Sequence, residues 1–164
     1  MRGVATISPR VIHLPGIDEA ALAGVARALA PRVRDGAVIH LAGPLGAGKT
    51  TFARALLREL GVGARIKSPT YTLIESYPVG DLTAHHLDLY RIAAADEVEW
   101  LGLRDLAAGK QLWLIEWPER ALAAIPPADL IVDLAHAATT RNLKLTALKP
   151  AASKWLDGID VLPE

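Results

Sequence analysis

The sequence of 164 residues contains no cysteine, which excludes a disulfide framework and a thiolate metal site and suits a reducing compartment. It also lacks a long apolar run: no stretch approaches the roughly 18 to 20 apolar residues that cross a bilayer. Near the N-terminus, Pro9 and Arg10 interrupt the apolar residues after Met1, so no secretory signal is expected. These absences predict a cytoplasmic protein that does not contact a membrane.

An excess of basic charge is missing too, because 18 Lys and Arg residues balance 18 Asp and Glu residues. Proteins that grip nucleic-acid backbones alone usually carry a basic excess or a clustered basic stripe. Direct and autonomous binding to nucleic acid is therefore not expected.

The length fits one domain, and we assign it to residues 1–150, with residues 151–164 as a C-terminal tail. Asp18 and Glu19 precede apolar residues at helical spacing, which predicts a first helix ending near Pro31. A second helix is expected after residue 48, with Gly61 as its stop, and short helices at 93–100 and 103–108. The expected strands are Ala37–Ala42, Tyr71–Tyr77, Leu82–Tyr90, Gln111–Ile115, Leu130–Leu134 and Leu143–Leu148.

The most informative motif is Gly43–Thr50, GPLGAGKT, which matches G-x-x-x-x-G-K-[ST] between a predicted strand and a predicted helix. In this phosphate-binding loop, or P-loop, glycines let backbone N–H groups turn toward phosphate oxygens at the positive end of a helix. Lys49 would reach the β- and γ-phosphates, and the Thr50 hydroxyl would bind magnesium. The predicted nucleotide-binding residues are Gly43, Leu45, Gly46, Ala47, Gly48, Lys49, Thr50 and Thr51.

The order of strands and helices around this loop predicts an α/β fold, a P-loop NTPase-type three-layer sandwich. Its central sheet should be mainly parallel, with antiparallel additions from the 71–90 hairpin and the last strands. A doubly wound nucleotide-binding sheet without a P-loop lacks a glycine fingerprint here. GTP-binding proteins of this class usually show an Asn/Thr-Lys-x-Asp run, which the sequence lacks, so ATP is favoured over GTP.

A P-loop needs a carboxylate near the magnesium ion, at the end of a neighbouring core strand. Asp88 and Glu116 each end a predicted strand, so we predict Thr50, Asp88 and Glu116 as the metal-binding residues. Each could instead be a simple cap of a turn. Thr70 lies in a loop, where a threonine can sense the γ-phosphate.

Three further features are ambiguous. His85 and His86 are adjacent on a strand and should point to opposite faces, so we expect no shared metal ion between them. Arg91 could face phosphate, although an arginine after a strand is more often solvated or paired. Trp113 and Trp117 are interpreted as core or interface aromatics without a role at the adenine.

Taken together, LGAGKTT, SPTYTL, HLDLYR and IEW, in this order over residues 1–150, resemble the TsaE (YjeE) family of bacterial tRNA threonylcarbamoyladenosine biosynthesis. The resemblance implies a P-loop fold, weak intrinsic ATPase activity, ATP and Mg²⁺ as cofactors, and TsaD and TsaB as partner subunits. It also implies that Asp88 and Glu116 face the metal and attacking water. Pro44, often acidic in the family, and the Leu87 of His86-Leu87, in place of Phe, are departures from the pattern.

We therefore predict an ATPase that hydrolyses ATP to ADP and phosphate in support of a tRNA-modifying complex, with tRNA contacted only indirectly. The predicted catalytic residues are Lys49, Thr70 and Glu116. A small-molecule P-loop kinase is the first alternative, although no insertion of lid size is evident. A subunit that binds ATP without hydrolysing it, so that nucleotide only orders a partner surface, is the second.

Overall fold

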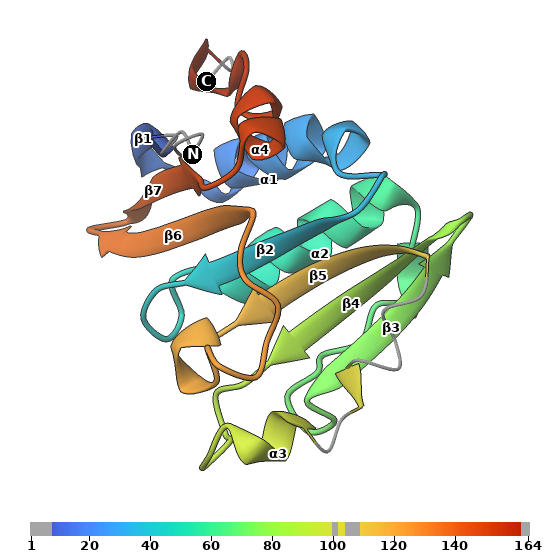
Figure 1. The fold of residues 1–164 in the computed structure, drawn as a ribbon. Helices are drawn as coiled ribbons and strands as arrows, with labels where there is room; N and C mark the ends of the chain where they lie inside the picture. The colour runs from blue at the N-terminus through green and yellow to red at the C-terminus, as the bar shows by residue number, and fades with distance from the viewer. Residues whose placement is uncertain (1–7, 100–101, 104–108, 162–164) are drawn as a thin grey trace, which may run out of the picture.

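The computed structural model describes residues 8–99, 102–103 and 109–161. Its centre is a seven-stranded sheet in the order β1-β7-β6-β2-β5-β4-β3 (Figure 1). The strands are β1 (Arg10–Ile17), β2 (Ala37–Ala42), β3 (Ile74–Val79), β4 (Leu82–Asp88), β5 (Lys110–Glu116), β6 (Leu130–Ala137) and β7 (Thr140–Ala147). The α-helices are α1 (Glu19–Leu29), α2 (Lys49–Leu60), α3 (Asp96–Glu99) and α4 (Pro150–Trp155).

The middle of this sheet is parallel and its edges are antiparallel. Strand β2 pairs in parallel with β5 and β6, and β4 pairs in parallel with β5. The β3–β4 hairpin adds one antiparallel edge, and β7 and β1 add the other. This arrangement confirms the predicted α/β fold with a mainly parallel centre and antiparallel additions.

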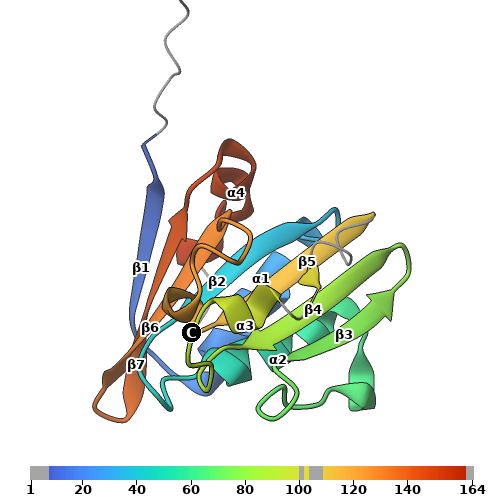
Figure 2. The same cartoon turned by 60° about the horizontal axis from the view of Figure 1, so that its bottom comes forward.

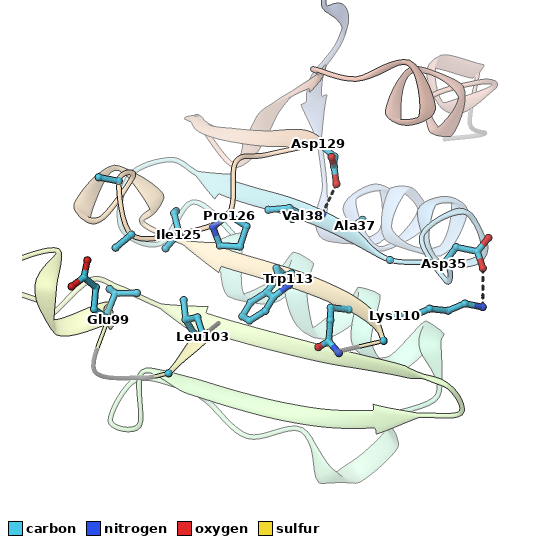
Figure 3. A pocket seen from close by; sticks show the side chains of 17 residues that line it. Asp35, Ala37, Val38, Glu99, Leu103, Lys110, Trp113, Ile125, Pro126 and Asp129 are labelled. Atoms are coloured by element: carbon cyan, nitrogen blue, oxygen red, sulfur yellow. Dashed lines mark hydrogen bonds and ion pairs between the residues drawn. The ribbon is translucent and has the colours of Figure 1, made fainter. Parts of the chain in front are cut away.

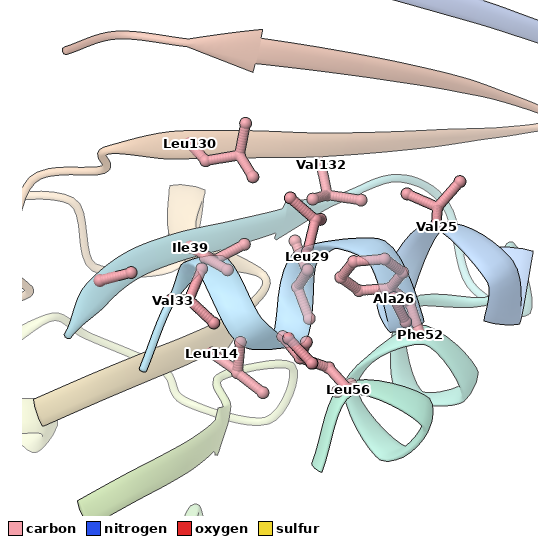
Figure 4. Close-up of a cluster of buried hydrophobic side chains, with 14 of the residues drawn as sticks. Val25, Ala26, Leu29, Val33, Ile39, Phe52, Leu56, Leu114, Leu130 and Val132 are labelled. Carbon is pink, nitrogen blue, oxygen red and sulfur yellow. The ribbon is translucent and has the colours of Figure 1, made fainter. Parts of the chain in front are cut away.

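Helices α1 and α2 cover one face of the sheet together (Figures 1 and 2). Asp18 caps α1, because its carboxylate accepts a hydrogen bond from the Ala21 N–H at 2.8 Å. The inward faces of both helices meet the buried side of the parallel strands in the main core, where Leu29 and Phe52 are fully buried (Figure 4). Burial of such large side chains contributes about 1.5–3 kcal/mol each, so this core holds α1 and α2 against the sheet.

The opposite face has a thinner cover. A second cluster there joins strand residues such as Leu87 and Ile115 to Val98 of α3 and to Ala121 and Ile125. Of the described residues in the helix predicted at 93–100, Asp96–Glu99 are helical, and residue 100 and most of the helix predicted at 103–108 lie outside the described residues. No helix in the described part of the chain is long and apolar enough to span a bilayer.

Two local predictions were wrong or incomplete. Tyr71–Leu73 is not strand: the Leu73 N–H bonds to the Pro69 carbonyl at 2.8 Å, and Leu73 has φ 65°, so the backbone turns before β3 begins. Strand β1 was not predicted, because Pro15 and Gly16 break its pattern of side chains.

The segment after Lys149 forms α4 and a 3-10 turn at Ile159–Val161. Its Ala152, Leu156 and Ile159 are buried in the main core. This part of the chain therefore packs on the domain.

Candidate functional site

The P-loop connects β2 to α2, and its glycines adopt backbone angles that other residues avoid. Gly43, Gly46 and Gly48 have φ values of 139°, 75° and 112°. A Cβ atom on Gly43 would lie 2.3 Å from the Leu134 carbonyl oxygen, which is a collision with backbone. Glycine is therefore required at this position for both conformation and space.

Lys49 is almost completely buried at the first position of α2. Its Nζ donates hydrogen bonds to the carbonyl oxygens of Gly43 at 2.5 Å and Pro44 at 2.9 Å, and lies 4.1 Å from the centre of the Trp117 ring. Burial lowers the pKa of Lys49, and the nearby Glu116 carboxylate opposes that change. The ammonium group is therefore held over the loop, where phosphate oxygens could replace its carbonyl partners.

Glu116 connects two other parts of the chain. Its carboxylate accepts hydrogen bonds from the Thr50 hydroxyl, at 2.8 and 3.0 Å, and lies 2.6 Å from His86 Nε2. His86 is fully buried and Glu116 is 2% exposed, so these contacts fix the carboxylate at the start of α2. Hydrogen bonds to two polar partners limit the orientations that this buried carboxylate can adopt.

Asp88 lies beside Glu116, because the two residues are direct register partners at the ends of β4 and β5. Its carboxylate accepts a hydrogen bond from the Tyr90 N–H at 3.0 Å. Burial raises the pKa of Asp88, the Tyr90 hydrogen bond opposes this, and the Glu116 charge adds to it. Two carboxylates side by side at the carboxyl ends of parallel strands form a local negative site.

The donors near this pair suit magnesium. Thr50, Asp88 and Glu116 offer only hard oxygen atoms, and Mg²⁺ in nucleotide sites commonly uses one or two protein carboxylates together with phosphates and water. The described residues contain no cluster of three or more His, Cys, Asp and Glu side chains placed for a metal ion. The three residues therefore fit a magnesium ion whose remaining ligands would be phosphate oxygens of a nucleotide and water molecules.

His85 and His86 point to opposite faces, as predicted. His85 Nδ1 lies 2.7 Å from the Ser76 hydroxyl, His85 Nε2 contacts the Gln111 side chain, and the ring stacks on Trp113. His86 faces the site and contacts Glu116. The two rings therefore have separate sets of neighbours.

Thr70 reaches the same site from the loop before β3. Its hydroxyl lies 2.6 Å from the Ser68 hydroxyl and contacts neither Glu116 nor Asp88 by a hydrogen bond in the described part of the chain. Tyr71 beside it is 84% exposed, and the Arg91 guanidinium lies 5.0 Å from the Tyr71 ring centre. The Thr70 hydroxyl is thus held by a local contact, whereas the neighbouring Tyr71 ring contacts Arg91 from the segment after β4.

One pocket of about 390 Å³ collects most of the predicted residues. Those lining it are Leu45, Gly46, Gly48, Lys49, Thr50, Thr51, Thr70, Asp88 and Glu116. Gly43 and Ala47 belong to the loop but do not line the pocket, and Ala47 is buried beneath it. Arg91, Tyr90, Trp117 and Arg141 line it too; Arg141, on β7, was missed from the sequence because it belongs to no motif.

A larger cavity, of about 950 Å³, lies elsewhere, beside Trp113, Pro126 and Asp129 (Figure 3). None of the predicted site residues lines it. We place the candidate site at the smaller pocket, because backbone donors, a buried lysine and paired carboxylates converge there.

The chain is similar in sequence and in fold to known proteins. Residues 17–143 match the family model described as "Threonylcarbamoyl adenosine biosynthesis protein TsaE". The tRNA threonylcarbamoyladenosine biosynthesis protein TsaE of Haemophilus influenzae is 41% identical over 110 residues, covering 67% of this chain and 70% of that protein. The TsaE protein of Bacillus subtilis is 35% identical over 125 residues, or 76% and 78% of the two chains. The crystal structure of Bacillus subtilis YdiB matches with a TM-score of 0.71 at 22% identity, covering 94% of this chain and 97% of that one, which shows a shared fold.

Proposed function

The chain belongs to the TsaE family of tRNA threonylcarbamoyladenosine biosynthesis, and from that premise we propose that it is a magnesium-dependent P-loop ATPase acting with TsaD and TsaB subunits. The observation that supports this most is the convergence of Thr50, Asp88 and Glu116 beside the P-loop. Three oxygen-bearing side chains from separate segments meet where a γ-phosphate would lie.

In this proposal the P-loop N–H groups bind the phosphates of ATP, and Lys49 exchanges its carbonyl contacts for β- and γ-phosphate oxygens. Thr50, Asp88 and Glu116 would hold Mg²⁺, which when bound would supply positive charge that stabilises the negative charge of the reacting phosphoryl group. Glu116 and Thr70 orient the attacking water, and ADP and phosphate are released. His86 keeps the Glu116 carboxylate in place.

Exposed aromatic side chains near the pocket support the proposal that activity depends on partner subunits. Tyr71 is 84% exposed and Tyr90 40% exposed, and both lie next to site residues, Thr70 and Arg91 respectively. Exposed aromatic side chains are enriched at protein interfaces. A partner that covers these rings would order the Thr70 loop, so we expect slow hydrolysis by the isolated chain and indirect contact with tRNA.

The test is ATP binding by titration calorimetry and steady-state hydrolysis, with and without TsaD and TsaB, for the parental protein, Lys49→Ala and the control Arg58→Ala. Arg58 is exposed near the far end of the same helix. Loss of a charge-assisted contact should weaken ATP binding roughly 10- to 100-fold in Lys49→Ala only.

Turnover by the parental protein should rise when both partners are added, and ATP should strengthen assembly, since coupling between binding equilibria is reciprocal. Unchanged ATP affinity in Lys49→Ala would overturn the proposed site. Transfer of labelled γ-phosphate to a metabolite would favour the kinase, and ATP-dependent assembly without hydrolysis would favour the binding subunit.

A further inference from the structure

Strand β6 runs past the end of the strand beside it. Its pairing with β2 ends at Ala42 and Asp133, whereas β6 itself continues through residues 134–137. This extension runs alongside the P-loop, and Figures 1 and 2 both show the β6–β7 hairpin beside the loop after β2. The Leu134 carbonyl oxygen lies 2.3 Å from where a Cβ atom on Gly43 would stand, so the extension touches the loop at its first glycine.

His136 lies on this extension and reaches the tip of the loop. The preceding members of its face of the strand, all fully buried in the main core, are Leu130, Val132 and Leu134. Beyond the end of β2, the next member of that series meets the P-loop: His136 Nε2 lies 3.1 Å from the Leu45 carbonyl oxygen. Its Cε1 lies 3.9 Å from where a Cβ atom on Gly46 would stand. A carbonyl oxygen only accepts hydrogen bonds, so Nε2 carries the hydrogen and donates it.

The first three carbonyl groups of the P-loop each have a side-chain partner. Lys49 Nζ donates to those of Gly43 and Pro44, and His136 donates to that of Leu45. In the proposed function Lys49 leaves its two carbonyl groups for phosphate oxygens. His136 does not line the pocket, so its contact needs no such exchange. Among the described residues, it is the side-chain hydrogen bond to a loop carbonyl that a bound nucleotide leaves in place.

The peptide unit between Leu45 and Gly46 shows what this hydrogen bond can do. The peptide bonds of the described residues are trans, and in a trans peptide the C=O and the following N–H point in opposite directions. A Leu45 carbonyl held toward His136 therefore turns the Gly46 N–H to the other side, where Gly46 lines the pocket. Gly46 has φ 75°, and glycine adopts positive and negative φ with similar ease, so its own conformation does not prevent this peptide from rotating.

We propose that His136 is a positioning residue for the nucleotide site, because it fixes the Leu45–Gly46 peptide so that the Gly46 N–H faces the phosphates. This inference rests on the proposed function, since it concerns the phosphate cradle of that site. His136 acts through the backbone of the loop and touches neither the base nor the metal ion. Its effect on affinity should therefore depend only on the phosphates of the ligand.

Three variants separate the hydrogen bond from the ring. His136→Leu removes the donor, whereas His136→Gln keeps an N–H group at about the position of Nε2. The matched control is His13→Leu, because His13 is exposed on β1 and the small pocket that it lines contains no P-loop residue. Loss of one hydrogen bond should weaken Mg-ATP binding by His136→Leu roughly 2- to 10-fold, with little change in His136→Gln or His13→Leu.

The experiment combines two measurements on the full chain. Titration calorimetry with Mg-ATP, and displacement of bound ATP by Mg-tripolyphosphate, compare a nucleotide with a ligand that has phosphates but no base. Both affinities should fall by the same factor in His136→Leu. Hydrogen exchange of backbone amides without ligand should be faster in the P-loop of His136→Leu than in that of His136→Gln or the parental chain. Thermal unfolding checks that every variant is folded.

Equal losses for the two ligands, recovery in His136→Gln and faster loop exchange support the inference. A loss for ATP alone overturns it, because His136 would then contact the base or the sugar. Unchanged affinities or unchanged loop exchange in His136→Leu overturn it as well, and so does an equal loss in His136→Gln. Failure of the proposed function would look different: the parental chain would bind neither ligand, while hydrogen exchange of the free chain would still report whether His136 holds the loop.

Discussion

Replacement of Glu116 separates the structural role of this residue from its proposed catalytic role. In Glu116→Ala the buried His86 ring loses its Nε2 partner, and its Nδ1 already lacks a partner among the described residues. An unpaired buried donor costs about 1–3 kcal/mol. For a chain of this length each kcal/mol lowers Tm by about 2–4 °C, so Tm should fall by about 2–12 °C.

Glu116→Gln is the matched variant, because its amide keeps the size of the side chain and an oxygen for the Thr50 hydroxyl or for His86. It should recover most of the lost Tm. Hydrolysis in the assembled complex should nevertheless fall in both variants, roughly 100-fold or more, since neither retains a carboxylate for metal or water. ADP affinity should change much less.

The assays are calorimetric Tm without nucleotide, ADP titration, and ATP turnover with both partners present. Parental turnover in Glu116→Gln would refute the catalytic role. An unchanged Tm in Glu116→Ala would refute the inference that the His86 contact stabilises the fold, and Glu116 would then be a simple strand-end acid.

Two further predictions concern neighbouring residues. Burial raises the pKa of Asp88, so the stability contributed by its protonated form is complete below the unfolded pKa of about 3.9 and is lost as pH rises through the higher folded pKa. Asp88→Asn should therefore be more stable than the parental protein at neutral pH without magnesium, yet hydrolyse little ATP. Urea unfolding of both proteins over a series of rising pH that begins at about pH 4 checks the sign. Thr70→Ala should lower turnover in the complex more than ADP affinity, because the proposed role of its hydroxyl is to orient the attacking water. Among the described residues this hydroxyl bonds only to Ser68, so parental turnover in Thr70→Ala would leave it with that contact within the loop as its only role.

The sequence predicts the part of the site that depends on fixed spacing. A P-loop places its glycines, Lys49 and Thr50 within eight residues, so local chemistry is sufficient to find them. Asp88 and Glu116 could be predicted because each ends an apolar strand, and parallel strands bring such ends to one edge.

The contacts among these residues could not be predicted in the same way. The Thr50–Glu116 and His86–Glu116 bonds join residues 66 and 30 positions apart, and only the register of β4 on β5 and the packing of α2 decide them. Tyr71–Leu73 misled the prediction, because β-branched and aromatic residues favour strands while the Pro69–Leu73 hydrogen bond closes a turn there. At these residues the hydrogen bond between Leu73 and Pro69 outweighs the strand preference of the side chains.

Sheet topology explains why an antiparallel addition contributes to a P-loop site. Strand β6 is parallel to β2, so its carboxyl end lies at the same edge of the sheet as the P-loop. Strand β7 runs back from that end after a short turn, which places its first residues, Thr140 and Arg141, at the edge where β2 ends. Any side chain at position 141 that faces the helices must therefore approach the start of α2, and in this chain that side chain is an arginine against Gly48. The hairpin thus acts as one wall of the pocket, a role that follows from strand direction and not from any sequence motif.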